Sequence, residues 1–197
     1  MRKILILGLF SLVGCTAQET QKVESSSSSE TVPYEQKSYT ESDSAANLDF
    51  IQLTEIAIKN LSGMQITYNP DATEVKLLPS DVLPDEKFTP FHNWTSVKII
   101  RKADSKNWHH FLVEAFSTES YDQSKSTAFS LCKDVWNKVD NRVPAVLDEL
   151  AIRLNAYEKA GSVPKVQQIK YGYVFNIDAS HYKDGYPVVC SLAYDKK

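Results

Sequence analysis

Histidine is the residue type of this chain best suited to acid–base or metal chemistry, but its spacing favours neither. The four histidines are His92, His109, His110 and His181. His109 and His110 are adjacent within an expected strand, so their rings point to opposite faces of a sheet. The zinc-binding spacings HxxxH, HExxH and CxxC do not occur in the sequence. We therefore expect no metal ion and no cofactor.

The run from Asp178 to His181 places an acid, a hydroxyl and an imidazole close together in sequence. Side chains on adjacent turn residues diverge, so we favour local hydrogen bonds of Asp178 and Ser180 with the backbone over a catalytic triad. There is no GxSxG motif. No catalytic residue is assigned, although an envelope-acting hydrolase that uses His110 or His181 with a nearby carboxylate stays open as an alternative.

Two irregular segments hold aromatic side chains that are more typical of binding than of catalysis. Residues 79–93 contain three prolines, and long connections of this kind are often functional. Residues 179–186 form a second loop with aromatic residues. Aromatic residues on rigid loops are the usual anchors of protein interfaces. The alternative is that these rings fold back and close the edge of the core. The predicted binding residues are Phe88, Phe91, Trp94, Tyr182 and Tyr186.

Helical spacing of apolar residues predicts three helices. The first covers residues 48–61, with Asn47 as its start and Gly63 as its stop. The second covers residues 120–141. The third follows Pro144, which suits a first helical turn.

Alternation of apolar and polar residues predicts the strands. The segments expected to pair as hairpins are 64–68 with 74–78, 95–102 with 108–116, and 165–178 with 187–194. The expected fold class is α+β, in which an antiparallel sheet has about three helices packed on one face and follows a disordered tether.

The first fourteen residues have the features of an export signal. A positively charged start, residues 1–3, precedes an apolar run, residues 4–13, which is shorter than the roughly 20 residues that span a bilayer. The run ends in Leu12-Val13-Gly14-Cys15, which resembles the lipobox of bacterial lipoproteins. The resemblance implies that residues 1–14 are a signal peptide and that Cys15 is acylated by fatty acids such as palmitate. The alternative is an ordinary signal peptide with a chance cysteine.

The lipobox resemblance also implies a location on the extracytoplasmic side of a membrane. Because Thr16 and not Asp follows Cys15, it implies the outer membrane facing the periplasm if the host has two membranes. Residues 15–46, which include five consecutive serines, are rich in polar and acidic residues and are expected to form a disordered tether. Residues 47–197 are expected to form one domain. The net charge of −3 excludes the basic profile of a nucleic-acid binder.

Cys132 and Cys190 are the two cysteines that remain in the expected domain. Each falls on the apolar face of its element. Because exported domains fold in an oxidising space, we predict a disulfide between them. Two buried free thiols are the alternative.

These features predict a membrane-anchored lipoprotein that binds a protein or another envelope component. It would then be an immunity or inhibitor protein, or an accessory subunit. We expect binding and not catalysis. Besides the hydrolase, a small-ligand carrier is the other alternative, and it would require a deep apolar cavity between sheet and helices.

Overall fold

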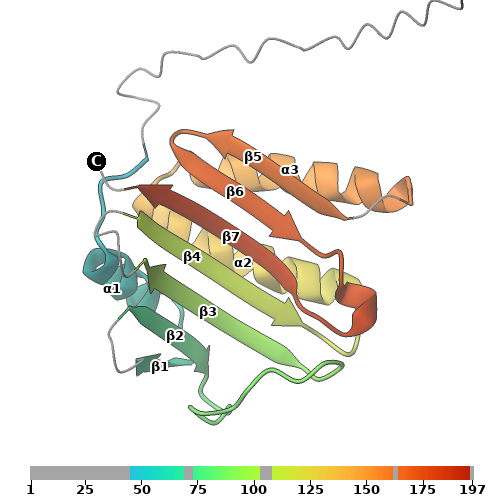
Figure 1. Ribbon diagram of the computed structural model, residues 1–197, viewed down its shortest axis with the longest axis horizontal. Coiled ribbons are helices and arrows are strands. Elements are labelled where there is room, and N and C mark those ends of the chain that lie inside the picture. The colour runs from blue at the N-terminus through green and yellow to red at the C-terminus, as the bar shows by residue number, and fades with distance from the viewer. Residues whose placement is uncertain (1–44, 69–72, 103–107, 162–163, 196–197) are drawn as a thin grey trace, which may run out of the picture. The chain divides into compact units, whose positions relative to one another are not determined.

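The computed structural model describes residues 45–68, 73–102, 108–161 and 164–195 (Figure 1). The predicted signal peptide, Cys15 and nearly all of the predicted tether lie outside these residues. So do the tips of the first two predicted hairpins.

Within these ranges, seven strands form one antiparallel sheet in the order β1-β2-β3-β4-β7-β6-β5. Helices α1, α2 and α3 lie behind one face, and no described helix covers the face toward the viewer in Figure 1, which we call the open face. The expected α+β fold is confirmed. The elements are α1 (Phe50–Asn60), β1 (Met64–Tyr68), β2 (Glu74–Pro79), β3 (Trp94–Arg101), β4 (Trp108–Phe116), α2 (Tyr121–Val139), α3 (Val143–Lys159), β5 (Lys165–Lys170), β6 (Tyr173–Asp178), the short 3-10 helix η2 (Tyr182–Asp184) and β7 (Val188–Asp195).

The start of α1 differs from the prediction. Asp49, not Asn47, is the N-cap: its carboxylate accepts from the Gln52 backbone N–H at 2.9 Å, and the Gln52 side chain accepts from the Asp49 backbone N–H at 3.0 Å. This reciprocal capping box satisfies two backbone donors at once. The other two helices begin as expected, with Ser120 capping α2 and Pro144 in the first turn of α3.

The prediction of one strand over residues 165–178 is wrong. The segment forms two strands, β5 and β6, joined at Tyr171 and Gly172. Both residues have positive φ, 53° and 75°, as a type I′ hairpin turn requires. Apolar residues stay at odd-numbered positions from Ile169 to Ile177, so the pattern did not reveal the break, although the two-residue turn reverses which positions face the helices. As a result Ile169 lies on the open face and is exposed, whereas Tyr173 is buried beneath the helices.

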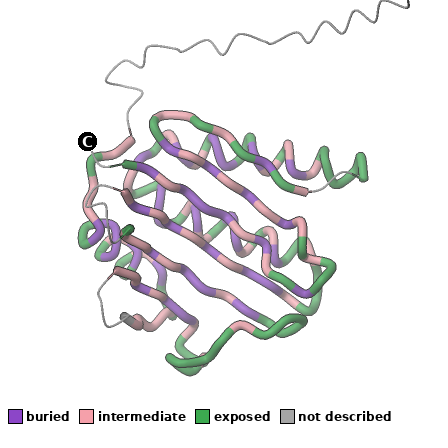
Figure 2. The backbone as a smooth tube through the Cα atoms, in the orientation of Figure 1, coloured by how far each residue is buried: buried purple, intermediate pink, exposed green. Residues whose placement is uncertain are grey.

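The main core lies between the sheet and the helices, and buried residues alternate along the central strands (Figure 2). Trp136 of α2 is fully buried at its centre. The ring of Trp136 meets Phe111, Tyr173 and Tyr194 edge-on, with centroids 5.1–5.8 Å apart. Edge-on pairs of this kind add stabilisation beyond the burial of area.

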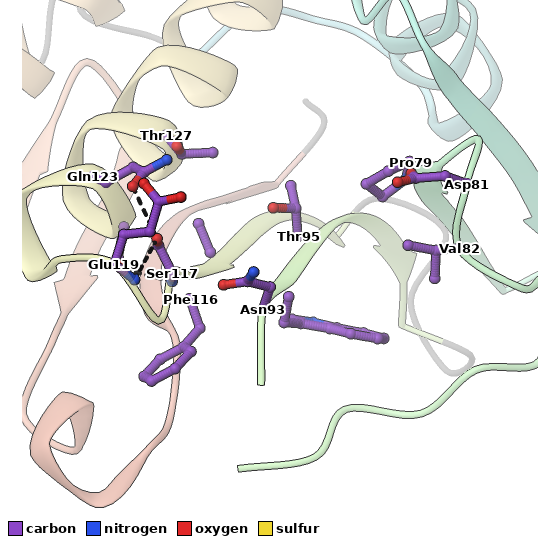
Figure 3. Close-up of a pocket in the computed structure, with 13 residues that line it drawn as sticks. Pro79, Asp81, Val82, Asn93, Thr95, Phe116, Ser117, Glu119, Gln123 and Thr127 are labelled. Carbon is purple, nitrogen blue, oxygen red and sulfur yellow. Dashed lines mark hydrogen bonds between the residues drawn. The ribbon is translucent and has the colours of Figure 1, made fainter. Parts of the chain in front are cut away.

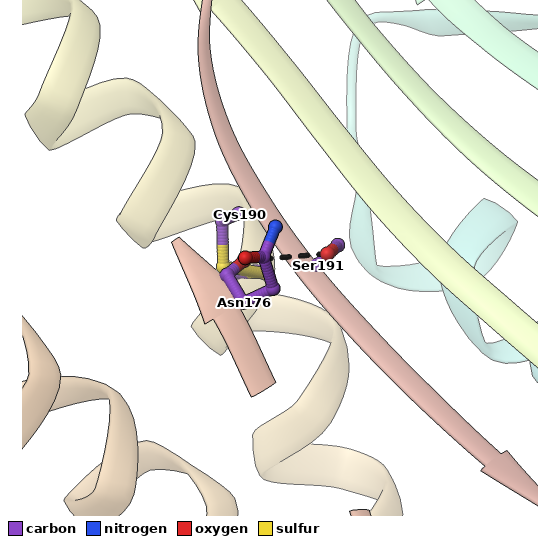
Figure 4. Close-up of a disulfide and its surroundings, with 4 residues drawn as sticks. Asn176, Cys190 and Ser191 are labelled. Carbon is purple, nitrogen blue, oxygen red and sulfur yellow. Dashed lines mark hydrogen bonds between the residues drawn. A yellow bond between two sulfur atoms is a disulfide. The ribbon is translucent and has the colours of Figure 1, made fainter. Parts of the chain in front are cut away.

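Cys132 of α2 and Cys190 of β7 lie at disulfide distance, with their Cα atoms 6.6 Å apart (Figure 4). The two cysteines of the predicted disulfide are thus close enough to be bridged. The bridge joins the helical layer to the centre of the sheet, because β7 lies between β4 and β6.

The described chain enters the fold at the β5–β6 turn, where Gly172 packs against Ala45. The Ala46 backbone N–H donates to the Tyr173 hydroxyl at 2.7 Å, which in turn donates to Asp140 at 3.1 Å. The turn and η2 lie at opposite ends of β6, so the chain enters opposite the end that carries the aromatic loops (Figure 1).

Candidate functional site

The two aromatic loops predicted from the sequence lie together at one end of the sheet. The Phe88 ring lies 6.0 Å from Trp94 and 5.5 Å from Tyr186, between ring centroids. The Phe91 backbone N–H donates to the Gly185 carbonyl at 3.1 Å. A Cβ at Gly185 would lie 2.7 Å from Phe91, and φ there is +86°, so glycine permits this junction. From the sequence, Gly185 was assigned only to the loop of residues 179–186.

Two of the five predicted binding residues close the edge of the core. Trp94 is only 6% exposed, and its indole N–H donates to Glu114 at 3.2 Å. The Tyr182 hydroxyl donates to the Ser117 carbonyl at 2.9 Å, and its ring packs 5.0 Å from Phe116. For Trp94 and Tyr182, the alternative reading is therefore correct: these rings fold back and close the edge of the core.

The other three predicted binding residues lie at the surface. Phe91 is 62% exposed and Tyr186 is 47% exposed, while Phe88 is half-buried between Tyr186 and Trp94. We call Phe88, Phe91 and Tyr186 the aromatic rim. The sequence predicted that these residues bind a partner, and that role stays a prediction.

The aromatic rim stands beside a hollow of about 460 Å³ on the open face. Its floor is one row of the sheet, because Glu114 of β4 pairs with Val189 of β7, which pairs with Asp178 of β6. The lining residues of this open-face hollow are Phe88, Lys98, Glu114, Asn176, Asp178, His181, Tyr186, Pro187 and Val189.

Glu114 in this hollow is an ionised, hydrogen-bonded carboxylate. Its Oε2 accepts from Trp94, from the Ser96 hydroxyl at 2.7 Å and from the Lys98 ammonium at 2.9 Å. Burial raises the pKa of Glu114, but the Lys98 charge and these hydrogen bonds outweigh burial and bring the pKa below its usual value. Glu114 is therefore unsuited to act as a general acid near neutral pH.

Asp178, which also lines this hollow, is likewise an ionised carboxylate that accepts several hydrogen bonds. It accepts from Lys165 at 2.6 Å and from the Ser180 backbone N–H at 3.0 Å. Burial raises the pKa of Asp178, and the hydrogen bonds from Lys165 and Ser180 lower it further than burial raises it. The Ser180 hydroxyl also donates to Asp178, at 2.5 Å. The Asp178 carboxylate therefore bonds to the local backbone as predicted, whereas the Ser180 hydroxyl bonds to that carboxylate and not to the backbone.

The two histidines of the hydrolase alternative lie in different surroundings. His181 is exposed, and its Nδ1 lies 3.2 Å from Asp184. His110 is half-buried on β4, with its ring 5.4 Å from that of Trp108, and burial lowers its pKa. In the described part of the chain, neither imidazole is hydrogen-bonded to a serine or cysteine nucleophile, so this geometry lends the hydrolase no support.

A second hollow, of about 240 Å³, lies at the same end of the sheet on the helix-covered side, and we call it the helix-side hollow (Figure 3). It opens there because α1 covers the other end of β3, where Arg101 lies over the Phe50 ring at 5.7 Å. Figure 3 shows Gln123 and Thr127 of α2 on one side of it. The lining residues are Pro79, Asp81, Val82, Asn93, Trp94, Thr95, Ala115, Phe116, Ser117, Glu119, Gln123, Ser124 and Thr127.

Among residues 45–68, 73–102, 108–161 and 164–195, no group of three or more His, Cys, Asp or Glu side chains is arranged to hold a metal ion. In the same ranges no helix has the length and apolar character needed to cross a bilayer. Comparisons with protein-family models, with curated proteins and with solved structures find no match. The function must therefore be inferred from the residues and their geometry.

Proposed function

We propose that this chain is a membrane-anchored bacterial lipoprotein whose extracytoplasmic domain binds a protein or another envelope component through the aromatic rim. Phe91 and Tyr186 carry this proposal. They come from loops more than 90 residues apart in sequence, yet one hydrogen-bonded junction holds both loops and leaves both rings exposed. Exposed aromatic rings on a fixed frame are typical interface anchors.

The neighbouring open-face hollow supports binding over catalysis. Its two carboxylates already accept hydrogen bonds from lysines, so neither is poised to take or give a proton near neutral pH. Its aromatic wall and polar floor resemble the composition of a binding site, in which apolar surface supplies affinity and a few polar groups fix orientation.

Membrane anchoring is proposed from the lipobox resemblance at Leu12-Val13-Gly14-Cys15. A single acyl chain binds membranes only marginally, whereas several chains on one residue hold firmly. Changing Cys15→Ala should move the protein from the membrane fraction to the soluble fraction. Unchanged membrane association of this variant would refute the lipid anchor.

Partner binding is tested by brief cross-linking, detergent solubilisation and capture of the tagged, lipidated chain, followed by quantitative mass spectrometry. The wild type is compared with a Phe91→Ala, Tyr186→Ala double variant. The matched control is Ile152→Ala, because Ile152 is 71% exposed on α3, away from the aromatic loops.

We expect one protein to be recovered near stoichiometry with the wild type and the control, and at least tenfold less with the double variant. Equal recovery with all three chains would refute the aromatic rim as the binding surface. Recovery of cell-wall fragments in place of a protein, with the same dependence on the rim, would identify the partner as an envelope polymer.

A further inference from the structure

The open-face hollow and the aromatic rim form one continuous surface. Phe88 and Tyr186 belong to the rim and also line the hollow. Their rings lie 5.5 Å apart between centroids and are tilted by 40° to each other. A further aromatic ring can pack against such a pair edge-on or offset. A protein that binds the rim would therefore meet the hollow with one of its side chains.

Glu114 at the floor of this hollow has one carboxylate oxygen that is free to accept hydrogen bonds. Its Oε2 accepts from Trp94, Ser96 and Lys98, whereas its Oε1 accepts no hydrogen bond in the described chain. The Glu114 side chain is only 18% exposed, and it lines the hollow. A largely buried carboxylate oxygen without a donor is unfavourable, and a donor that enters the hollow would satisfy it.

The two carboxylates that line the hollow are both neutralised by lysine. Lys98 pairs with Glu114 at 2.9 Å, and Lys165 pairs with Asp178 at 2.6 Å. Lys98 would repel a second cation that approached Glu114, and the two carboxylates would repel an anion. An uncharged donor is therefore favoured, and its hydrogen bond to a carboxylate is stronger than one between two neutral groups.

The size and walls of the hollow suit an aromatic side chain with a hydroxyl group. Its volume of about 460 Å³ lies within the roughly 300–1,000 Å³ of typical ligand pockets. A phenylalanine ring has no donor for Glu114 Oε1, and an indole N–H can only donate. A phenol hydroxyl donates and also accepts, so it can accept from Lys98, whose ammonium donates only to Glu114 in the described chain.

We propose that the open-face hollow binds a tyrosine side chain of the partner, with its ring against Phe88 and Tyr186 and its hydroxyl between Glu114 Oε1 and Lys98. The proposal rests on the proposed binding of a protein at the aromatic rim, and it specifies one residue of that protein. Tyrosine is among the residues that most often supply the binding energy of an interface from within a pocket.

The test is ligand-detected NMR on the full lipidated chain in detergent. The probes are glucose and three tripeptides, blocked at both ends, that carry tyrosine, phenylalanine or arginine between two glycines. We expect millimolar binding of the tyrosine peptide and binding of the other two peptides that is weaker by about threefold or more, because phenylalanine lacks the hydroxyl and Lys98 repels arginine. Glu114→Gln should remove most of the preference for tyrosine over phenylalanine.

Val189→Phe places a ring on the floor of the hollow and should abolish binding of the tyrosine peptide. Val174→Phe is the matched control, because Val174 lies on the same open face, opposite Ala193, and does not line the hollow. This control should bind the peptide as the wild type does.

The proposal is overturned if the tyrosine peptide does not bind, if the phenylalanine or arginine peptide binds as well, or if glucose binds in its place. Equal binding by the Val189→Phe and Val174→Phe variants would also overturn it. The test needs no partner, so its failure is distinct from failure of the capture experiment at the aromatic rim.

Discussion

The covered and open faces of the sheet differ in what their side chains contact. On β4, Phe111 and Val113 point to the helices and are fully buried, whereas Leu112 and Glu114, one residue further along, are partly exposed on the open face. Burial of apolar area stabilises a fold by about 25 cal/mol per Å². Stability is therefore concentrated on the covered face, while the open face and its loops keep groups available for recognition. Stability and partner binding should be separable by mutation.

The largest stability loss is expected at the centre of the covered face. Trp136→Ala removes a fully buried ring that meets three aromatic partners. Loss of a buried tryptophan costs about 3–5 kcal/mol of unfolding free energy. Chemical denaturation followed by circular dichroism measures this loss. A cost below about 1 kcal/mol would show that the covered face is not the main source of stability.

The disulfide is expected to have the next largest effect. Removing both sulfurs with Cys132→Ala and Cys190→Ala should lower the unfolding free energy by about 2–4 kcal/mol, since the bridge closes a long loop of the unfolded chain; the two residues are 58 apart in sequence. Thermal unfolding with and without reductant measures the effect. Two alkylatable thiols in the unreduced wild type, and no stability difference from the double variant, would argue against the bridge.

Among the side chains of the open face, Glu114 is expected to make the largest contribution to the unfolding free energy. Glu114→Gln should cost about 1–3 kcal/mol, because hydrogen bonds to a partly buried charge are lost. The folded pKa of Glu114 lies below its usual value, so this stabilisation is present above about pH 5 and is lost as the pH falls through the lowered pKa.

The wild-type unfolding free energy should therefore decrease on acidification below about pH 5. The Glu114→Gln variant should show a shallower decrease. Asp178 and Asp140 have lowered pKa values as well. The variant should therefore still lose unfolding free energy on acidification, but less than the wild type does. Identical pH profiles of the two proteins would contradict the account of this carboxylate.

The smallest stability effect is expected at the aromatic rim. The Phe91→Ala, Tyr186→Ala variant loses the ring contact between Phe88 and Tyr186 but no large buried side chain. The cost should not exceed about 1.5 kcal/mol. Denaturation under the conditions used for Trp136→Ala measures it. A cost as large as that of Trp136→Ala would mean that the rim is part of the core, and the separation of the two faces would fail.

The sequence predicted most of the fold because the apolar periodicity of each element matches its packing. The burial of Cys132 and Cys190 on facing elements followed directly from that periodicity. The pattern failed at Tyr171-Gly172, where apolar residues stay at odd-numbered positions although the two-residue turn reverses which positions face the helices. The boundary of α1 was missed because Asn47 and Asp49 are both good caps, and the reciprocal bond with Gln52 decides between them.

The candidate site was only half predictable. Aromatic composition identified both loops. Their contact with each other depends on the close packing of Gly185 against Phe91, which is a long-range contact that no local sequence pattern shows. Lys98, Glu114 and Asn176 were not assigned to the site, although each is a polar residue on the solvent side of its strand. Their convergence follows from the strand order β3-β4-β7-β6, which joins segments distant in sequence.

Site-specific photo-crosslinking in the native host tests the central claim most directly. A photoreactive phenylalanine is placed at Phe91, at Tyr186 or at Ile152, one position at a time, in the full lipidated chain. The aromatic rim account predicts the same cross-linked protein from positions 91 and 186 and none from position 152. Adducts from position 152 alone, or the same adducts from all three positions, would contradict it.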